Sequence, residues 1–239
     1  MKSAGFMVLL LGTFLFAGSL PTQVCADAGL KDVVSSLEQG YVLLNDVQAD
    51  FTQRTAIASI KKEQRGYGTL YIKKPSRSTA MFRFNYEKPL QQIVSNGKSV
   101  WFYLPENKQV LISDATNLFD AQNGITLNYL TGMDRISKDF TASFAGNGRD
   151  KKGNYVLELI PKKQNRVIAK LQLTVAAKAV EQYVQEGKAK DPFPIISSVI
   201  YDPYGNRTSI DFSKIKVNRG ISGSLFNFKV PRGIEVIKK

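Results

Sequence analysis

The sequence predicts a mainly β protein: a single domain built on one large antiparallel sheet that is strongly curved or barrel-like. Three observations support this fold class. Segments in which apolar and polar residues alternate recur along the chain, about eleven in number. Turn residues such as Asn96-Gly97 separate them, and helical spacing is confined to a few short stretches. No internal repeat divides the 239 residues, and this length suits one all-β domain.

The chain opens with the features of a secretory signal peptide. Lys2 provides a positive charge, Phe6 to Ala17 is mostly apolar, and the small residues Val24 and Ala26 fit a cleavage site. The apolar stretch is shorter than the roughly 20 residues of a membrane span. We therefore predict a signal peptide over residues 1–26, which is cleaved, and a single exported, soluble domain over residues 27–239.

Cys25 is the only cysteine, and it leaves two possibilities. It is removed with the signal peptide, or it becomes the lipid-bearing first residue of a membrane-anchored protein. The residues before it, Thr22-Gln23-Val24, lack the leucine and small residues typical of a lipidation motif, which favours removal. The mature chain then has no disulfide and depends on packing alone for its stability.

The first mature element is an amphipathic helix over residues 28–45, because its apolar residues follow the 3.6-residue period. The pattern then changes to a period of two, which predicts a strand over residues 47–57. A polar link follows at 61–64. The next strand ends before Pro75, because proline cannot donate to a ladder of hydrogen bonds. Between residues 68 and 112 we expect five strands, at 68–72, 79–86, 91–95, 98–103 and 109–112.

Residues 114–139 interrupt the series with apolar residues at helical spacing, so we expect two short helices that cover the sheet. Residues 177–194 are a polar stretch with two prolines, predicted as a mobile excursion of loop with room for a helix. Whether this excursion contacts a partner or is inert stays open. The later strands are predicted at 140–145, 154–160, 167–175, 195–201, 206–212 and 224–229, with a short tail after Pro231.

The composition disfavours several classes of function. The chain has no histidine, and without Cys25 it has no Ser-His or Cys-His pair and no thiolate or imidazole metal site. The usual catalytic and metal-binding residues are therefore missing, although catalysis of another kind stays open. The net charge of +13 is spread in blocks of no more than two basic residues. This favours a dispersed basic surface over a site for a polyanion or an anionic membrane. We therefore expect no nucleic-acid partner.

Residues 81–103, MFRFNYEKPLQQIVSNGKSVWFY, are rich in aromatic side chains. Phe82, Phe84 and Tyr86 alternate along one expected strand, and Trp101 and Tyr103 alternate along another. Antiparallel strands with this spacing are expected to present a continuous aromatic wall on one side of the sheet. The wall is either an ordinary core or the lining of a site for an apolar guest.

The order of motifs resembles that of the LolA-type outer-membrane lipoprotein carriers. The matching segments span nearly all of the mature chain: VQADFTQ, GYGTLYIKKP, FRFNYEKPLQQIVSNGKSVWFYLPENKQV, LNYLTG, DPYGNRTSI and FNFKVPRGIEVI. The resemblance implies an unclosed antiparallel β-barrel, with a lid of short helices over its concave face and an apolar cavity for acyl chains. It also implies a periplasmic monomer that receives acylated lipoproteins from an inner-membrane ABC-type release complex and delivers them to an outer-membrane receptor. Such carriers are not enzymes and use no cofactor or metal, and the resemblance implies the same for this chain.

The resemblance also suggests which residues form the site. Phe82 and Phe84 are expected to line the cavity, with Trp101 and Tyr103 as further candidates and Leu130 in the covering helix. Ordinary core packing is the alternative for all of them. Lys74 stands where many relatives carry an arginine that latches the helices. Lysine lacks the planar fork of arginine, so we expect a weaker or different latch, and a solvated strand-end lysine is the alternative.

Other functions stay open on the sequence alone. A membrane-anchored outer-membrane receptor of related fold would require lipidation of Cys25. A lipid-sensing periplasmic regulator would require a further partner-binding domain. A periplasmic hydrolase is disfavoured by the missing histidine and cysteine, and a polyanion-binding module would depend on charge alone.

Overall fold

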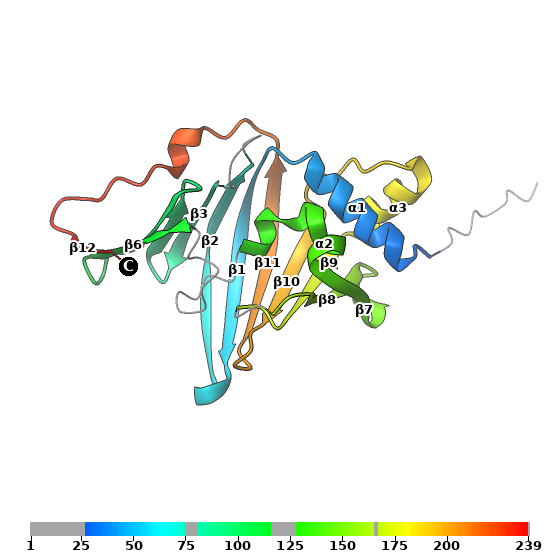
Figure 1. Ribbon diagram of the computed structural model, residues 1–239, viewed down its shortest axis with the longest axis horizontal. Helices are drawn as coiled ribbons and strands as arrows, with labels where there is room; N and C mark the ends of the chain where they lie inside the picture. Colours follow the sequence, from blue (N-terminus) through cyan, green and yellow to red (C-terminus); the bar gives the residue numbers. More distant parts are fainter. Residues whose placement is uncertain (1–26, 75–80, 116–127, 165–166, 239) are drawn as a thin grey trace, which may run out of the picture.

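The computed structural model describes residues 27–74, 81–115, 128–164 and 167–238. Within them the chain forms one twelve-stranded sheet in the order β12-β6-β5-β4-β3-β2-β1-β11-β10-β9-β8-β7 (Figure 1). The predicted mainly β, unclosed architecture is confirmed. The strands are β1 (Asp46–Ile57), β2 (Lys62–Lys73), β3 (Met81–Lys88), β4 (Gln91–Ser95), β5 (Ser99–Leu104), β6 (Gln109–Asp114), β7 (Phe140–Arg149), β8 (Tyr155–Pro161), β9 (Lys170–Val175), β10 (Ile195–Tyr201), β11 (Arg207–Val217) and β12 (Glu235–Lys238).

The helices gather on one side of the sheet, over the half that contains β7 to β9 (Figure 1). The helix expected at 28–45 is α1 (Leu30–Val42). Gly29 is its N-cap residue, and the N–H of Gly29 donates to the Asp32 carboxylate. The excursion at 177–194 contains a helix that packs beside α1. The other helical elements are α2 (Ile136–Asp139), α3 (Ala177–Glu186), and the 3₁₀ turns η1 (Ala58–Ile60), η4 (Asn128–Thr131), η5 (Met133–Arg135) and η6 (Gly223–Phe226). Much of the expected 114–139 cover lies outside the described residues.

The β1–β2 hairpin is longer than the sequence suggested. The residues expected to form a polar link, 61–64, mostly belong to β2, and the reversal occurs at η1, where Lys61 has a φ of 49°. Near this reversal both faces of the hairpin are exposed, so its residues are polar although they are extended. A polar stretch therefore did not indicate a loop at this position.

The C-terminal region contains the largest error of the sequence-based prediction. The strand expected at 224–229 is absent: these residues include the end of η6 and an extended segment without a ladder. The expected tail is instead β12, which pairs parallel with β6 while every other neighbouring pair is antiparallel. Residues 218–234, here called the C-terminal strap, cross the outer face of the sheet to reach β12 (Figure 1).

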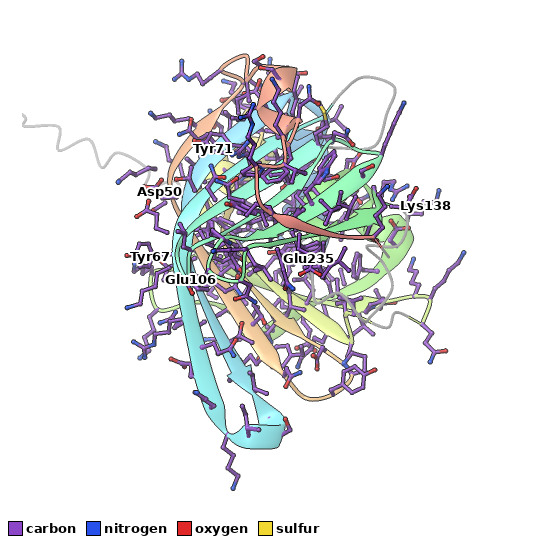
Figure 2. All side chains as sticks on the ribbon, turned by 90° about the vertical axis from the view of Figure 1, so that its left-hand side faces the viewer. Asp50, Tyr67, Tyr71, Glu106, Lys138 and Glu235 are labelled. Atoms are coloured by element: carbon purple, nitrogen blue, oxygen red, sulfur yellow. The ribbon has the colours of Figure 1, made fainter. Side chains whose placement is uncertain are left out.

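Asp46 and Arg83 are among the residues that anchor the C-terminal strap to the sheet. The carboxylate of Asp46 accepts backbone N–H bonds from Arg219, Gly220 and Ile221, at 2.8, 3.0 and 3.2 Å. Further along, the guanidinium of Arg83 donates to the carbonyl oxygen of Leu225 at 3.0 Å. Figure 2 shows the strap descending to Glu235 at the start of β12. Fully buried side chains on this outer face include Val94 and Val110 of the sheet and Phe226 of the strap itself.

Candidate functional site

The main hydrophobic cluster lies between the concave face of the sheet and the helices. Its centre is aromatic. The centroid of the Phe51 ring lies 5.4 Å from that of Phe84 and 4.8 Å from that of Tyr86, and both pairs are edge-to-face. Gly68 lies on β2 directly between Phe51 and Tyr86. A Cβ at position 68 would lie 1.9 Å from the carbonyl oxygen of Asn85, so only glycine allows these strands to approach so closely.

Phe82 and Phe84 occupy the face that the sequence predicted. Both are buried on the concave side of β3, with ring centroids 6.1 Å apart. Their backbone partners on β2 are Ile72 and Leu70, which are also buried in the cluster. Their position fits both alternatives, permanent core packing and contact with a guest, so their role in binding stays a prediction.

Trp101 and Tyr103 do not belong to this wall, and the expectation that they share a face with Phe84 is wrong. The register pairs Phe84 with Ile93 and Ile93 with Phe102, so Phe102 faces the concave side. Trp101 and Tyr103 lie on the outer face, where their rings are 6.3 and 5.4 Å from Phe228 of the C-terminal strap. Counting residues through both turns would have found Phe102, because each connection exchanges odd and even positions.

The cover over the cluster comes from α1 and from the η4–η5–α2 segment. Val33, Leu37 and Tyr41 of α1 are fully buried. Leu130, which the sequence predicted as part of the cover, is fully buried in the same cluster, as are Met133 and Ile136. The described part of the cover therefore presents a mainly apolar face to the sheet. Whether Leu130 touches a bound guest stays a prediction.

Lys74 connects the end of β2 to both parts of the cover. Its ammonium donates a hydrogen bond to the carbonyl oxygen of Tyr41 at 2.9 Å and lies 3.7 Å from the carboxylate of Asp134. It also lies 5.7 Å from the centroid of the Tyr41 ring. Because the Lys74 side chain is only 20% exposed, the reading as a solvated strand-end lysine is wrong. The sequence contained no signal for Asp134, which is 60 positions away from Lys74.

Three tyrosine hydroxyls are buried among these apolar residues. The Tyr86 hydroxyl donates to the Gln53 side chain at 2.8 Å, and those of Tyr129 and Ser198 bond to each other. Within the described part of the chain, the hydroxyl of Tyr41 has no hydrogen-bond partner. Burial raises the pKa of all three, and for Tyr41 the nearby Tyr129 and Asp134 raise the pKa further. All three phenols are therefore neutral at physiological pH.

The rest of the described structure adds two observations. Among the described residues, no group of three or more His, Cys, Asp or Glu side chains could hold a metal ion. No helix in that part of the chain is both long enough and apolar enough to cross a membrane.

An unclosed twelve-stranded sheet with an apolar concave face under helices defines a half-barrel protein with an internal apolar surface. The family model described as "Outer membrane lipoprotein carrier protein LolA" matches residues 43–229, and the chain belongs to this family.

Curated relatives match over nearly their whole length. The outer-membrane lipoprotein carrier protein of Albidiferax ferrireducens is 28% identical over 223 residues, covering 90% of this chain and 96% of the relative. That of Neisseria meningitidis serogroup B is 28% identical over 226 residues, covering 94% and 95%. Among solved structures, a LolA-superfamily protein from Nitrosomonas europaea has a TM-score of 0.41 at 13% identity, covering 84% of this chain and 99% of that one.

Proposed function

We propose that this chain is a periplasmic carrier of lipoproteins, which holds the acyl chains of its cargo against the concave face of its sheet. Membership of the LolA family supports this function, as do the names of the curated relatives. The observation that carries it is the aromatic concave face beneath a largely apolar cover that Lys74 links to the end of β2. Phe82, Phe84 and Leu130 are the proposed contacts to the acyl chains.

The energetics of an acyl chain explain why such a surface is needed. At about 0.8 kcal/mol per methylene, a chain of about fifteen methylenes carries roughly 12 kcal/mol of transfer free energy. Cargo with such chains cannot cross water unaided. A carrier must also release what it binds, and therefore it must stay far from the limit of about −18 to −21 kcal/mol for non-covalent binding. Rigid aromatic rings suit this task, because they offer a large contact area with little side-chain entropy to lose.

Binding requires the cover to move. The side chains of Val33, Leu37 and Tyr41 are fully buried in the same cluster as Phe84, so a guest that enters between the sheet and the cover must displace α1 or the η4–α2 segment outward. The hydrogen bond of Lys74 to Tyr41 and its ion pair with Asp134 both oppose that movement. Lys74 is therefore the proposed latch of the cover.

The same proposal includes the partners. Residues 1–26 are cleaved, and the domain 27–239 acts as a monomer in the periplasm of a Gram-negative bacterium. It accepts acylated lipoproteins from an inner-membrane ABC-type complex, which supplies the energy for loading, and passes them to an outer-membrane receptor. The domain binds and releases its cargo without catalysis, a cofactor or nucleic acid.

The test uses one lipoprotein in two forms, acylated and with its lipid-bearing cysteine replaced by serine. Each form is mixed with the mature chain in detergent, the detergent is removed, and the mixture is separated by gel filtration. We expect only the acylated form to remain soluble and to elute with the chain. If both forms elute with it, or neither does, the proposal fails. The mass of the mature N-terminus separates the carrier, which begins at Asp27, from an anchored receptor that retains an acylated Cys25.

A further inference from the structure

Tyr41 has a buried hydroxyl whose hydrogen-bonding capacity is unused. Its side chain is fully buried, and in the described part of the structure it is the one buried side-chain polar group without a hydrogen-bond partner. A hydroxyl removed from water without a partner destabilises the protein, whereas a phenylalanine at the same position would fill the same volume without this penalty. Such an exception calls for a physical explanation.

The surroundings of this hydroxyl place it within the proposed site. The ring of Tyr41 packs on Phe193 at 5.7 Å, and Phe193 packs edge-on against Phe212 of β11 at the same distance. The carbonyl oxygen of Tyr41 accepts the latch bond from Lys74. Tyr41 therefore lies where the cover, the sheet and the latch meet.

Two other buried tyrosines of the same cluster have partners for their hydroxyls. Tyr86 bonds to Gln53, and Tyr129 bonds to Ser198. Tyr41 differs from both because its partner is missing, and burial keeps its hydroxyl protonated. It is therefore a neutral donor.

The chemistry of the cargo contains the complementary group. The acyl chains of a lipoprotein are attached through ester or amide linkages, and each linkage has a carbonyl oxygen directly next to the first methylene. When the chain enters an apolar site, this oxygen loses its water and needs a donor. The unpaired donor of the protein and the unpaired acceptor of the cargo satisfy each other.

We propose that the Tyr41 hydroxyl donates a hydrogen bond to an ester or amide carbonyl at the head of a bound acyl chain. Resting on the proposed carrier function, this inference makes Tyr41 a specificity residue. The site then prefers acyl esters and amides over plain hydrocarbon of the same length.

The test measures this preference directly. Hexadecane and methyl hexadecanoate compete with a polarity-sensitive fluorescent probe for wild type, Tyr41→Phe and Tyr183→Phe. We expect the ratio of ester to alkane affinity to fall about 3- to 10-fold in Tyr41→Phe. Tyr183→Phe is the matched control. It removes a tyrosine hydroxyl from α3 that accepts a bond from Gln39 outside the apolar cluster, and the ratio should stay at the wild-type value.

Two further measurements complete the test. With a ¹³C-labelled ester carbonyl, the bound ester should show a lower carbonyl stretching frequency in wild type than in Tyr41→Phe. The urea midpoint of unliganded Tyr41→Phe should rise, because an unsatisfied buried group has been removed. An equal ratio in wild type and Tyr41→Phe overturns the role of Tyr41 while the carrier function stands. If neither compound displaces the probe from wild type, both proposals fall.

Discussion

The substitution Lys74→Met tests whether the latch controls opening of the cover. Methionine keeps most of the aliphatic side chain and removes the ammonium, and with it the 2.9 Å bond to Tyr41 and the ion pair with Asp134. The Tyr41 carbonyl keeps a second donor, the backbone N–H of Leu44 at 3.3 Å, so no carbonyl is orphaned. The effect therefore reflects the loss of the latch itself.

The magnitude follows from the contacts. A hydrogen bond from a charged donor contributes about 1.5–3 kcal/mol, and a partly exposed ion pair adds up to about 1 kcal/mol. Water hydrates the Tyr41 carbonyl and the Asp134 carboxylate when the cover opens, and this offsets part of the lost interaction energy. We expect a net shift of about 2 kcal/mol toward the open cover, which corresponds to about 30-fold in population. The rate of uptake of an apolar fluorescent probe, measured by stopped flow, should rise by up to that factor.

Lys73→Met is the matched control. Lys73 is the neighbour of Lys74, but its ammonium donates to the carbonyl oxygen of Ile221 in the C-terminal strap, on the outer face. This variant loses a similar bond without touching the cover, so uptake should stay at the wild-type rate. Lys74→Arg should slow uptake, because a planar fork can bond Tyr41 and Asp134 together. If Lys74→Met and Lys73→Met take up the probe equally fast, Lys74 is not the latch.

Three further outcomes are expected. Phe84→Ala should lower the free energy of unfolding by about 3–5 kcal/mol and weaken acyl-chain binding, because Phe84 is buried on the concave face. Trp101→Ala, on the outer face, should leave binding unchanged. Equal loss of binding in both variants would contradict the assignment of faces. Asp46→Ala should destabilise by about 2–4 kcal/mol, because three backbone N–H groups lose their acceptor. Limited proteolysis should then cut the C-terminal strap first, and an unchanged cleavage pattern would count against this anchor. The free energy of unfolding, measured in urea, should fall as pH rises above about 10. In that range the tyrosines of the unfolded chain ionise, whereas Tyr41, Tyr86 and Tyr129 stay protonated in the folded chain because their pKa values are raised. A stability that does not change with pH in this range would contradict the raised pKa values.

Much of the fold could be predicted from the sequence because periodicity is a local property. The alternation at Phe82, Phe84 and Tyr86 placed these rings on one face of β3, and the helical spacing after residue 28 located α1. The hairpin at Asn96-Gly97 was also recognisable, and Gly97 has the positive φ that its turn requires. The resemblance then supplied the helical cover and a role for position 74.

The rest depended on contacts between distant parts of the chain. Lys74 meets Asp134, and Asp46 holds the start of the C-terminal strap, although nothing near either residue indicates its partner. The alternation around Phe226 and Phe228 had the period of a strand but comes from packing on the outer face. A local pattern cannot distinguish a strand from such a segment. Side chains of a strap that pack against a sheet are as apolar as the buried side chains of a hydrogen-bonded strand.

By itself, the sequence determined which elements form and which side chains share a face within each one, because these follow from the 3.6- and two-residue periods of the backbone. Only the tertiary structure decided which face of the sheet is the concave one, that Phe102 and not Trp101 lies on it, and that Tyr41 is buried with its hydroxyl unpaired. The physical reason is that register and partner choice minimise the free energy of the whole sheet with its cover. That free energy is summed over residues far apart in the chain, and no local segment contains it.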